Sequence, residues 1–391
     1  MVVEEYEGGL LDSDGRRGAL AAPEDEESVF VATQWQLMWW RFRRHKLAVA
    51  SAFILSLFYI AAIGAEFLSS SDPATSVVDV AYLRPQKIHW FDGGSFSPHV
   101  EKVTGARDPK TFKKIYAVDP DVKIPVSFFV RGYEYNFLGF IKADRHLLGI
   151  EGGEEGEYNR AAPYLLGTDV LGRDMAARII MGTRISLSIG LVGVTMSFFL
   201  GITLGGISGY YGGWADAVIQ RIIEITRSIP TIPLWVALAA SVPRDWSIIR
   251  LYFAITIILS LVAWTELGRV VRGRFLSMRE EDFITAARIA GAGDIRIIFR
   301  HMVPSFTSHV IAAATLAVPF MIISETALSF LGLGLRPPAI SWGVLLQATQ
   351  NVQSVAVYPW LMSPSVPVII AVLAFNFMGD GLRDAADPYS T

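Results

Sequence analysis

The sequence contains no cysteine, which excludes structural disulfides, catalysis by a thiolate, and zinc or iron–sulfur centres held by cysteine. The dipeptide Gly-Lys never occurs, so the chain has no phosphate-binding loop of the Walker A type and is not expected to hydrolyse ATP by itself. The histidines lack metal-ligand spacing, and the Asp-rich loops that bind calcium are missing. We therefore expect no catalytic residue, no metal site and no bound cofactor in this chain.

Charge is also scarce. Asp, Glu, Lys and Arg make up 18% of the 391 residues, whereas soluble domains carry about 25%. Hydrophobic residues make up 52%, the mean hydropathy is +0.40, and the net charge of −3 is too balanced to suggest nucleic-acid binding. This composition is typical of a membrane protein.

Six apolar runs are long enough to cross about 30 Å of hydrocarbon, which takes about 20 helical residues. They cover roughly residues 47–68, 185–210, 217–241, 247–267, 308–330 and 364–382. The third run has charged residues near its start and contains Pro230 and Pro233, so we expect a proline-kinked helix whose charged end lies at the membrane interface. The predicted fold class is an all-α polytopic membrane protein with one β-containing insert.

The chain divides into four parts. Residues 1–40 begin as an acidic, Gly-rich segment and are expected to form a disordered or loosely attached tail. The first apolar run is too long and too far from the start for a secretory signal, so residues 41–68 are expected to be a retained transmembrane helix. Residues 69–164 form the insert, and residues 165–391 form a core of five transmembrane helices.

The distribution of Arg and Lys sets the expected orientation, because cytoplasmic loops are enriched in both. Arg41, Arg43, Arg44 and Lys46 border the first span. The loop between the fourth and fifth spans holds seven Arg against four acidic residues. Both regions are therefore expected to face the cytoplasm, which places the N- and C-termini inside and the insert outside.

The insert is rich in aromatic residues, which we expect to form a small core. These residues are Trp90, Phe91, Phe96, Phe112, Tyr116, Phe128, Phe129, Tyr133, Tyr135, Phe137 and Phe140. Residues 125–138 are predicted to form a strand, a turn at Arg131-Gly132 and a second strand. We expect a small folded extracytoplasmic domain that contains β-structure.

The loop between the fourth and fifth spans is the most informative segment. Ser277 and Glu280 form a capping-box pattern before an expected helix, which Gly291 should end. Asp294 is expected to cap a second short helix that continues to Val303. Two short helices around a glycine corner fit a groove on another protein. The alternative is an amphipathic helix lying on the membrane surface, and composition alone favours it.

The order of residues favours the docking interpretation. Ala286-Ala287 is followed by Gly291 and then by His301-Met-Val-Pro304. Other motifs follow in one order, over residues 166–174, 209–216, 227–230, 324–334, 341–343 and 379–384. Together they resemble the second, C-type permease subunit of the dipeptide/oligopeptide/nickel family of ABC importers. Residues 35–70 resemble that family's N-terminal segment and residues 165–388 its transport core, although Thr285 stands where the family has Glu.

The resemblance implies six transmembrane helices of the ABC importer type, with the extracytoplasmic insert between helices one and two. It implies one half of the pore of an ATP-driven importer of short peptides, which an extracytoplasmic binding protein delivers. The implied partners are a homologous second permease, two ATPase subunits that bind ATP and Mg, the binding protein, and the lipid of a bacterial inner membrane. Coupling helices over residues 278–303 would dock the ATPase. The implied coupling residues are Thr285, Ala286, Ala287, Arg288, Gly291, Asp294 and Pro304.

Two groups of residues keep two interpretations each. The small-residue stripe Gly201, Gly205 and Gly209 allows a close helix approach, either to the companion permease or within this subunit. The outer-side motif residues are expected to cap the helix that follows or to contact the binding protein; local physics favours the cap, and the two roles are compatible. These motif residues are Asp169, Arg173 and Asp174.

Carboxylates near the predicted span ends have a structural interpretation. Glu325 and Asp380 are expected to be interfacial, either snorkelling or hydrogen-bonded. Glu224 lies between Arg221 and Arg227 at helical spacing, which predicts a local ion pair. No chain of ionisable residues marks a proton relay at mid-span, which disfavours a proton-coupled transporter.

The substrate is the most open question. Short peptides are favoured by the resemblance, oligosaccharides or another small solute remain the alternative, and nickel is disfavoured because no His or Met cluster faces the presumed pore. A non-ABC proton-coupled transporter is the rival from another class. The insert either grips the binding protein and steers substrate, or only stabilises the permease pair. The sequence does not identify the substrate-binding residues.

Overall fold

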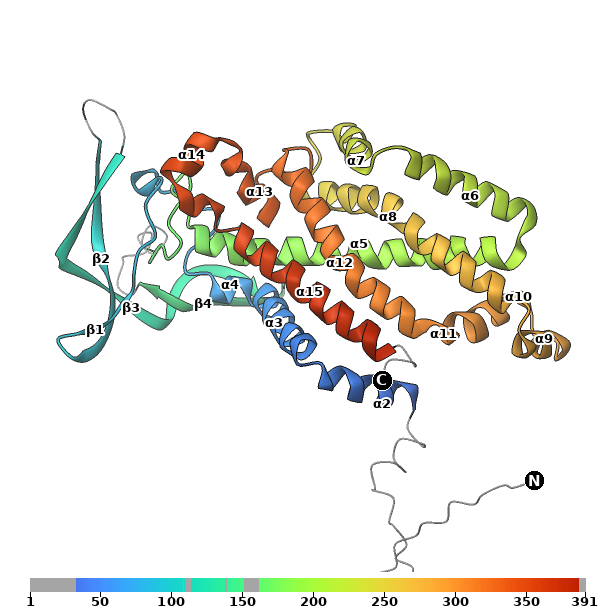
Figure 1. The fold of residues 1–391 in the computed structure, drawn as a ribbon. Helices are drawn as coiled ribbons and strands as arrows, with labels where there is room; N and C mark the ends of the chain where they lie inside the picture. The colour runs from blue at the N-terminus through green and yellow to red at the C-terminus, as the bar shows by residue number, and fades with distance from the viewer. Residues whose placement is uncertain (1–32, 108, 110–113, 138, 151–161, 387–391) are drawn as a thin grey trace, which may run out of the picture.

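The computed structural model describes residues 33–107, 109, 114–137, 139–150 and 162–386. Long helices lie side by side, and an antiparallel sheet lies at one end of them, opposite to α9 (Figure 1). The helices are α2 (Gln34–Arg44), α3 (Lys46–Ile63), α4 (Ala65–Leu68), α5 (Met175–Tyr211), α6 (Gly213–Ser228), α7 (Thr231–Ala240), α8 (Ile248–Met278), α9 (Asp282–Ile289), α10 (Asp294–Arg296), α11 (Val303–Ser305), α12 (Thr307–Phe330), α13 (Trp342–Leu346), α14 (Val352–Val357) and α15 (Ser365–Ala386). Short 3-10 turns cover Val78–Val80, Gln347–Gln350 and Pro359–Met362, and a π-helix covers Ile297–Met302.

The N-terminal region contains more structure than predicted. Residues 1–32 of the predicted tail lie outside the described residues, but α2 begins at Gln34, before the predicted boundary at residue 40. Thr33 and Gln36 form a capping box that starts this helix, a local signal within the region expected to be loose. His45 then separates α2 from α3 and accepts a hydrogen bond from the backbone N–H of Ala48. The first span therefore begins at Lys46.

The predicted helical fold is confirmed. Within the described residues, five helices are long and apolar enough to cross a membrane, and a bent helix pair raises the number to six if it counts as one span. The five are α3, α5, α8, α12 and the helical stretch that ends with α15. α5 and α8 both run from the sheet end to the α9 end, and the bent pair of α6 and α7 returns the chain between them (Figure 1).

The predicted third span is a broken helix. The axes of α6 and α7 differ by 92°, far more than the predicted kink. The reason is local, because a residue before proline avoids the helical region of backbone conformation. Ile229 accordingly adopts an extended conformation before Pro230. Proline also lacks the N–H that would continue the helix.

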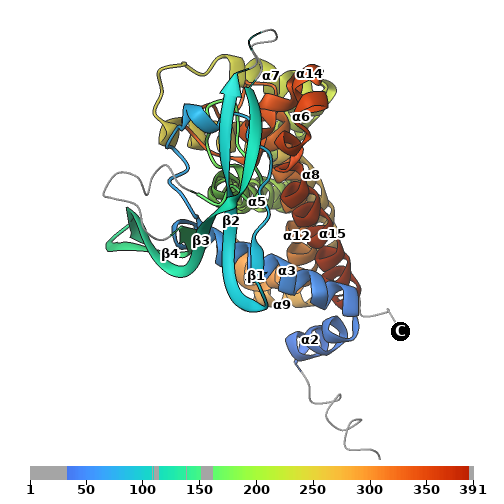
Figure 2. The ribbon, with the colours of Figure 1, turned by 90° about the vertical axis from the view of Figure 1, so that its left-hand side faces the viewer.

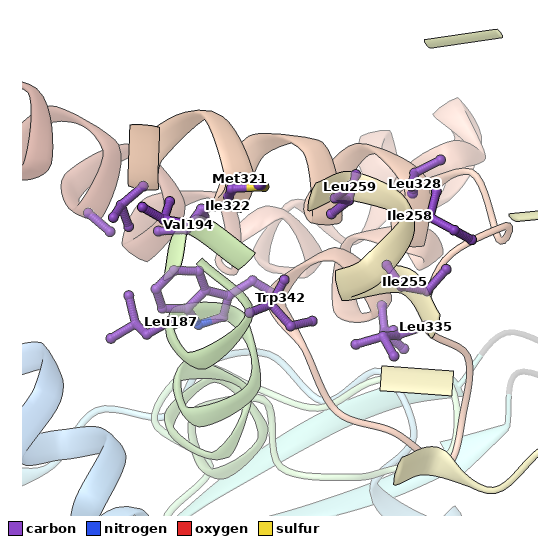
Figure 3. Packing of buried hydrophobic residues seen from close by; sticks show 14 of the residues in the cluster. Leu187, Val194, Ile255, Ile258, Leu259, Met321, Ile322, Leu328, Leu335 and Trp342 are labelled. Carbon is purple, nitrogen blue, oxygen red and sulfur yellow. The ribbon is translucent and has the colours of Figure 1, made fainter. Parts of the chain in front are cut away.

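The helices pack around one large apolar core. Its buried side chains come mainly from α5, α8, α12 and the segment around Trp342, and they point toward one another (Figure 3). Trp342 is fully buried, and its indole N–H donates to the carbonyl oxygen of Ile179. Burial of this apolar set fixes the relative positions of the three long helices within this chain.

The insert is a four-stranded antiparallel sheet in the order β1-β2-β3-β4 within the described residues. Its strands are β1 (His89–Asp92), β2 (Ser95–Arg107), β3 (Lys114–Phe137) and β4 (Ile141–Ile150). Figure 2, which looks onto the sheet, shows it in front of the helix ends. The predicted small β-containing insert is therefore confirmed.

Two details of the insert prediction are wrong. Arg131 and Gly132 do not form a turn but lie within β3, at a register shift against β4. Gly132 is needed there for space, since a Cβ at this position would lie 2.5 Å from the His146 ring. The turn between β3 and β4 instead contains Gly139, whose φ is +84°. Sequence reasoning placed the turn at the wrong glycine.

The predicted aromatic core is wrong for most of its members, although Tyr116 packs against the buried cluster of Leu83, Ala162 and Tyr164. Trp90, Phe91, Phe96, Phe128, Phe129 and Phe140 are all exposed, and Phe112 lies outside the described residues. Trp90 instead stacks on Phe96 and Phe128 at the sheet surface. A single small sheet buries few of its side chains, because little of either face is covered by other elements. The buried positions are filled by smaller residues such as Val100 and Val126.

Candidate functional site

Residues 279–305, called the knob below, form a projection at the end of the bundle opposite the sheet (Figure 1). The inner side of the knob shares one apolar cluster with the ends of α5 and α8. The buried members of this cluster include Tyr210, Phe275, Ile284, Ile297 and Met302. The Asp294 carboxylate also accepts a hydrogen bond of 2.7 Å from the Tyr210 hydroxyl. The knob is therefore packed onto the bundle, so that a force on one acts on the other.

The predicted glycine corner of the knob is confirmed. α9 ends at Ile289, and Gly291 follows with φ +81°, a left-handed conformation that glycine adopts without strain. The Gly291 N–H donates to Arg288 O and the Ala292 N–H to Ala287 O, at 3.0 Å each. This pair of bonds is the Schellman arrangement that ends helices.

Both predicted caps in the knob are wrong. Ser277 does not start a helix but lies in the last turn of α8, which continues to Met278 because Phe275 is packed into the apolar cluster. The residue that precedes α9 is Glu281, and its side chain makes no capping bond. Asp294 does not cap the second helix either, because its carboxylate binds Tyr210 instead.

The predicted coupling residues lie on different parts of the knob. Thr285, Ala286 and Arg288 are exposed on α9, and Ala287 is half-buried. Pro304 lies in α11, near the start of α12. The contact of these residues with an ATPase stays a prediction.

Sequence reasoning missed the exposed apolar residues of the knob. Ile289, Ile295 and Phe299 are exposed by 84%, 74% and 57%. The sequence did contain a signal for them. Ile284 and Ile297 already supply the buried side of the knob, so its further apolar residues exceed what that side needs. An apolar tip on a packed base is a feature typical of a protein-binding surface.

The glycine stripe of α5 faces α8 of the same chain. A Cβ on Gly201 would lie 3.0 Å from Leu267, and a Cβ on Gly205 would lie 2.4 Å from the carbonyl oxygen of Gly268. The same atom on Gly209 would lie 2.6 Å from Phe275. The structure therefore uses this stripe for packing within the subunit, the second of the two interpretations.

The outer motif of residues 168–174 is a buried structural loop. The Asp169 carboxylate accepts hydrogen bonds from the backbone N–H of Leu171 and Arg173 and from the Arg173 side chain. Asp174 is the N-cap of α5, as local physics favoured, and accepts from Ala176 N–H at 2.9 Å. Asp169 and Asp174 are only 5% and 2% exposed, whereas Arg173 is half-buried, so a contact of this loop with a binding protein stays a prediction that Arg173 could serve.

Asp174 also ties this loop to the first span. Its Oδ2 accepts hydrogen bonds from Ser70 and Ser71, which follow α4. Burial raises the pKa of Asp174, and hydrogen bonds from Ser70, Ala176 and Ser71 oppose that rise. The exposed residues of the loop are Val170 and Leu171, which sequence reasoning passed over.

Glu325 lies near the end of α12, and its side chain is fully buried within this chain. Its carboxylate accepts hydrogen bonds of 2.8 Å from the hydroxyls of Ser329 and Ser341, and one of 3.5 Å from Ser186. The alternative of a hydrogen-bonded structural carboxylate is the correct one. The network joins α5, α12 and the start of α13, which explains why the motifs at residues 324–334 and 341–343 occur together.

Cavities lie at both the sheet end and the middle of the described bundle. The outer one, of about 700 Å³, lies between the sheet and residues 357–360, and it is lined by basic and aromatic side chains. Burial raises the pKa of Tyr116 to about 12, so its hydroxyl stays protonated and donates to Ala81 O. The inner cavity, of about 590 Å³, lies among α5, α6, α7, α8 and α12.

Charged residues on α6 pair in two ways. Glu224 forms the predicted local ion pair with Arg221, at 2.9 Å. Arg227 instead bonds to Glu266 of α8, across the inner cavity wall. Sequence reasoning could not find this second pair, because its two members are separated by 39 residues.

Comparison with known proteins supplies the family. Residues 201–389 match the model of the binding-protein-dependent transport system inner membrane component. Residues 33–85 match the N-terminal transmembrane domain of oligopeptide transport permease C. A putative peptide permease of Brucella suis is 39% identical over 224 residues, which cover 57% of this chain and 72% of the relative. This chain belongs to that permease family.

Other relatives have similar names. A dipeptide transport system permease protein of Alkalihalophilus pseudofirmus is 41% identical over 58% of this chain and 73% of its own length. An oligopeptide transport system permease protein of Bacillus subtilis is 35% identical over 57% of this chain and 70% of its own length. Among solved structures, the inward-facing MetNI methionine ABC transporter is similar at a TM-score of 0.42 and 21% identity, over 54% of this chain and 97% of the other.

Membership of this family fixes the class of the protein. It is a permease subunit of an ABC importer, a multi-pass protein of the inner membrane, and not an enzyme itself. Such an importer contains a second permease, ATPases and a binding protein. The relatives align with well under two thirds of this permease, so the insert is the part that family comparison describes least.

Proposed function

We propose that this permease is one half of the pore of an importer that takes up short peptides from an extracytoplasmic binding protein. The relatives named as dipeptide and oligopeptide permeases support this substrate class. In this proposal the N- and C-termini are cytoplasmic, and two partner ATPases bind the ATP and Mg that drive transport. The Arg-rich loop that becomes the knob supports this orientation.

The observation that carries the proposal is the construction of the knob. Its apolar tip is exposed while its base is packed on α5 and α8, as a lever between an ATPase and the bundle requires. ATP binding closes the two ATPases, and the knob passes that motion to the long helices as a rigid-body tilt. The permease contributes two alternative packings of the helices, biased by what binds at each end.

The experiment is a pull-down of the tagged permease from detergent-solubilised membranes, followed by ATPase assays. The binding protein is added with either a peptide pool or an oligosaccharide pool. Co-purification of the ATPases and stimulation by peptides is the expected result. Stimulation by sugars alone would support an ATP-driven importer but contradict peptides as its substrate. Absence of any ATPase under several mild detergents would contradict the docking role and favour a proton-coupled transporter.

A further inference from the structure

The inner cavity has a polar wall in an otherwise apolar part of the bundle. The cavity lies at the level of the middle of the long helices, because its lining includes Val194 near the middle of α5 and Ala317 near the middle of α12. A volume of about 590 Å³ lies within the range of sites that hold small ligands. The polar and charged lining residues are Ser197, Thr226, Arg227, Thr231, Thr265 and Glu266.

Arg227 and Glu266 are the charged members of this wall. Their side chains bond to each other, yet 39% and 66% of their surfaces remain exposed. Glu266 lies one helical turn beyond Val262, which lines the same cavity. Charged side chains on transmembrane helices are costly, and they usually face the bundle interior or a water-filled cavity. Arg227 and Glu266 both line the cavity with their charged groups, as expected of a water-filled path.

The break between α6 and α7 lies at the same wall. Thr226 and Arg227 belong to the last turns of α6, and Thr231 begins α7. Backbone without helical hydrogen bonds is tolerated at membrane depth only where it is buried in protein or lines a water-filled cavity. The broken helix thus gives a second, independent indication of a wet path on this side of the bundle.

A second hollow continues from Arg227 toward the knob. It has a volume of about 560 Å³ and includes Arg269 and Arg272 of α8, which lie nearer to the end of that helix. Arg227 lines both spaces. The ion pair with Glu266 therefore stands between a cavity at mid-span and a hollow rich in arginine at the knob end.

We propose that Arg227 and Glu266 contact the substrate during translocation, which rests on the proposed uptake of peptides. The Arg227 guanidinium binds the C-terminal carboxylate of a short peptide, and the Glu266 carboxylate binds its α-ammonium group. The two residues pair with each other when no peptide is present. A zwitterionic peptide can replace this pair without leaving either charge in the cavity wall uncompensated.

The test measures peptide uptake by the complete importer in proteoliposomes with its binding protein. For each variant, uptake of trialanine is divided by wild-type uptake, so that the selectivity of the binding protein cancels. Arg227→Gln and Glu266→Gln are each expected to lower uptake about tenfold or more. The matched control is Arg221→Gln, which removes an ion-paired arginine of the same helix that lines neither cavity, and its uptake should stay near wild type.

A charge swap separates a substrate contact from a structural ion pair. The double variant Arg227→Glu with Glu266→Arg restores the pair but reverses the two charges that meet the peptide. We expect normal co-purification of the companion permease and the ATPases, with uptake still about tenfold or more below wild type. Restored uptake in the swap, or wild-type uptake in both single variants, would overturn the inference.

Two other outcomes have distinct meanings. If the companion permease no longer co-purifies with the single variants, the cavity wall belongs to a subunit interface. That result would contradict the proposed substrate contact. If the wild-type importer itself takes up no peptide, the proposed function is wrong. That result does not depend on the charge variants, so it can be told apart from a failure of the substrate-contact proposal.

Discussion

At the scale of single residues, the side chains that the family motifs contain hold the fold together. Glu325 and Asp174 are both acidic, and both are buried among hydroxyl and N–H donors. Each joins segments that are far apart in the sequence. Such residues contribute to function through position, because a buried acceptor that satisfies several donors is expensive to remove.

The Glu325 network gives the first prediction. Glu325→Ala leaves the hydroxyls of Ser186, Ser329 and Ser341 without their common acceptor, so we expect the free energy of unfolding to fall by about 2 kcal/mol or more. Thermal unfolding of the purified permease in detergent measures the change. Glu280→Ala is the control, because Glu280 is exposed and its removal should leave the midpoint nearly unchanged. Equal midpoints for the two variants would contradict a structural role.

Two glycines of the same helix pair give the second prediction. A Cβ at Gly205 would lie 2.4 Å from Gly268 O, whereas one at Gly273 would meet no atom within 4 Å. Gly205→Ala should therefore force α5 and α8 apart and destabilise the permease by about 1–3 kcal/mol. Gly273→Ala should stabilise it by about 0.5–1 kcal/mol, because alanine loses less backbone freedom in a helix. Melting temperatures of the two variants that move in the same direction would refute this reading.

At the scale of elements, two interruptions of regular helix lie where motion and transport are expected. The α6–α7 break opens onto the inner cavity, and the corner at Gly291 sets the direction of the chain between α9 and α10. Both follow from local residue chemistry. Proline removes a donor and restricts its predecessor, and glycine permits a positive φ.

The Gly291 corner gives the third prediction. Gly291→Pro replaces a φ of +81° by one near −65°, which breaks the two hydrogen bonds that end α9 and turns the rest of the knob away from its docking position. We expect membrane insertion to remain and ATPase activity to become uncoupled from peptide uptake, as measured in parallel in proteoliposomes. Gly293→Ala is the control, since its φ is −72° and a Cβ there meets no atom within 4 Å. Coupled, wild-type transport by Gly291→Pro would count against the lever.

At the scale of the whole molecule, the knob and the insert lie at opposite ends of the same long helices (Figure 1). The insert is held to the bundle near the end of the first span. The ring of His146 lies 2.8 Å from Glu66 O, and Glu66 forms an ion pair of 2.5 Å with Arg184 of α5. A domain held at this point is placed to influence what enters the pore while contributing little to the packing of the core.

Deletion of the insert gives the fourth prediction. Removal of residues 74–158 keeps the bonds of Ser70 and Ser71 to Asp174 and of Pro73 O to Arg178, which tie the start of α5 to the first span. It removes the bonds of Val80 and Leu83 to Thr168, so assembly is measured beside uptake, and we expect the bundle still to insert and assemble. If the exposed aromatic surface grips the binding protein, uptake should fall about tenfold or more at unchanged assembly. Uptake at the wild-type level would refute steering, and loss of the companion permease would assign the insert to stabilising the permease pair.

Much of the helical organisation could be predicted because its signals are local. Apolar runs of sufficient length gave the spans, and the Gly291 corner and the Asp174 cap follow from the preferences of single residues. The failures have the same physical basis. Ser277 matched a capping pattern, but packing of Phe275 extended α8 beyond it. In the insert, the choice between Gly132 and Gly139 as the turn depended on how β3 and β4 are paired.

The sequence by itself determined that this protein is a helical membrane permease with a β-containing insert, because hydrophobic length and ordered motifs act within short segments. Only the tertiary structure decided that Glu325 is buried, that the glycine stripe packs on α8, and that Arg227 bonds to Glu266. These outcomes depend on which helices meet and at what register. Contacts between distant segments carry no local signature, so they appear only when the chain is packed.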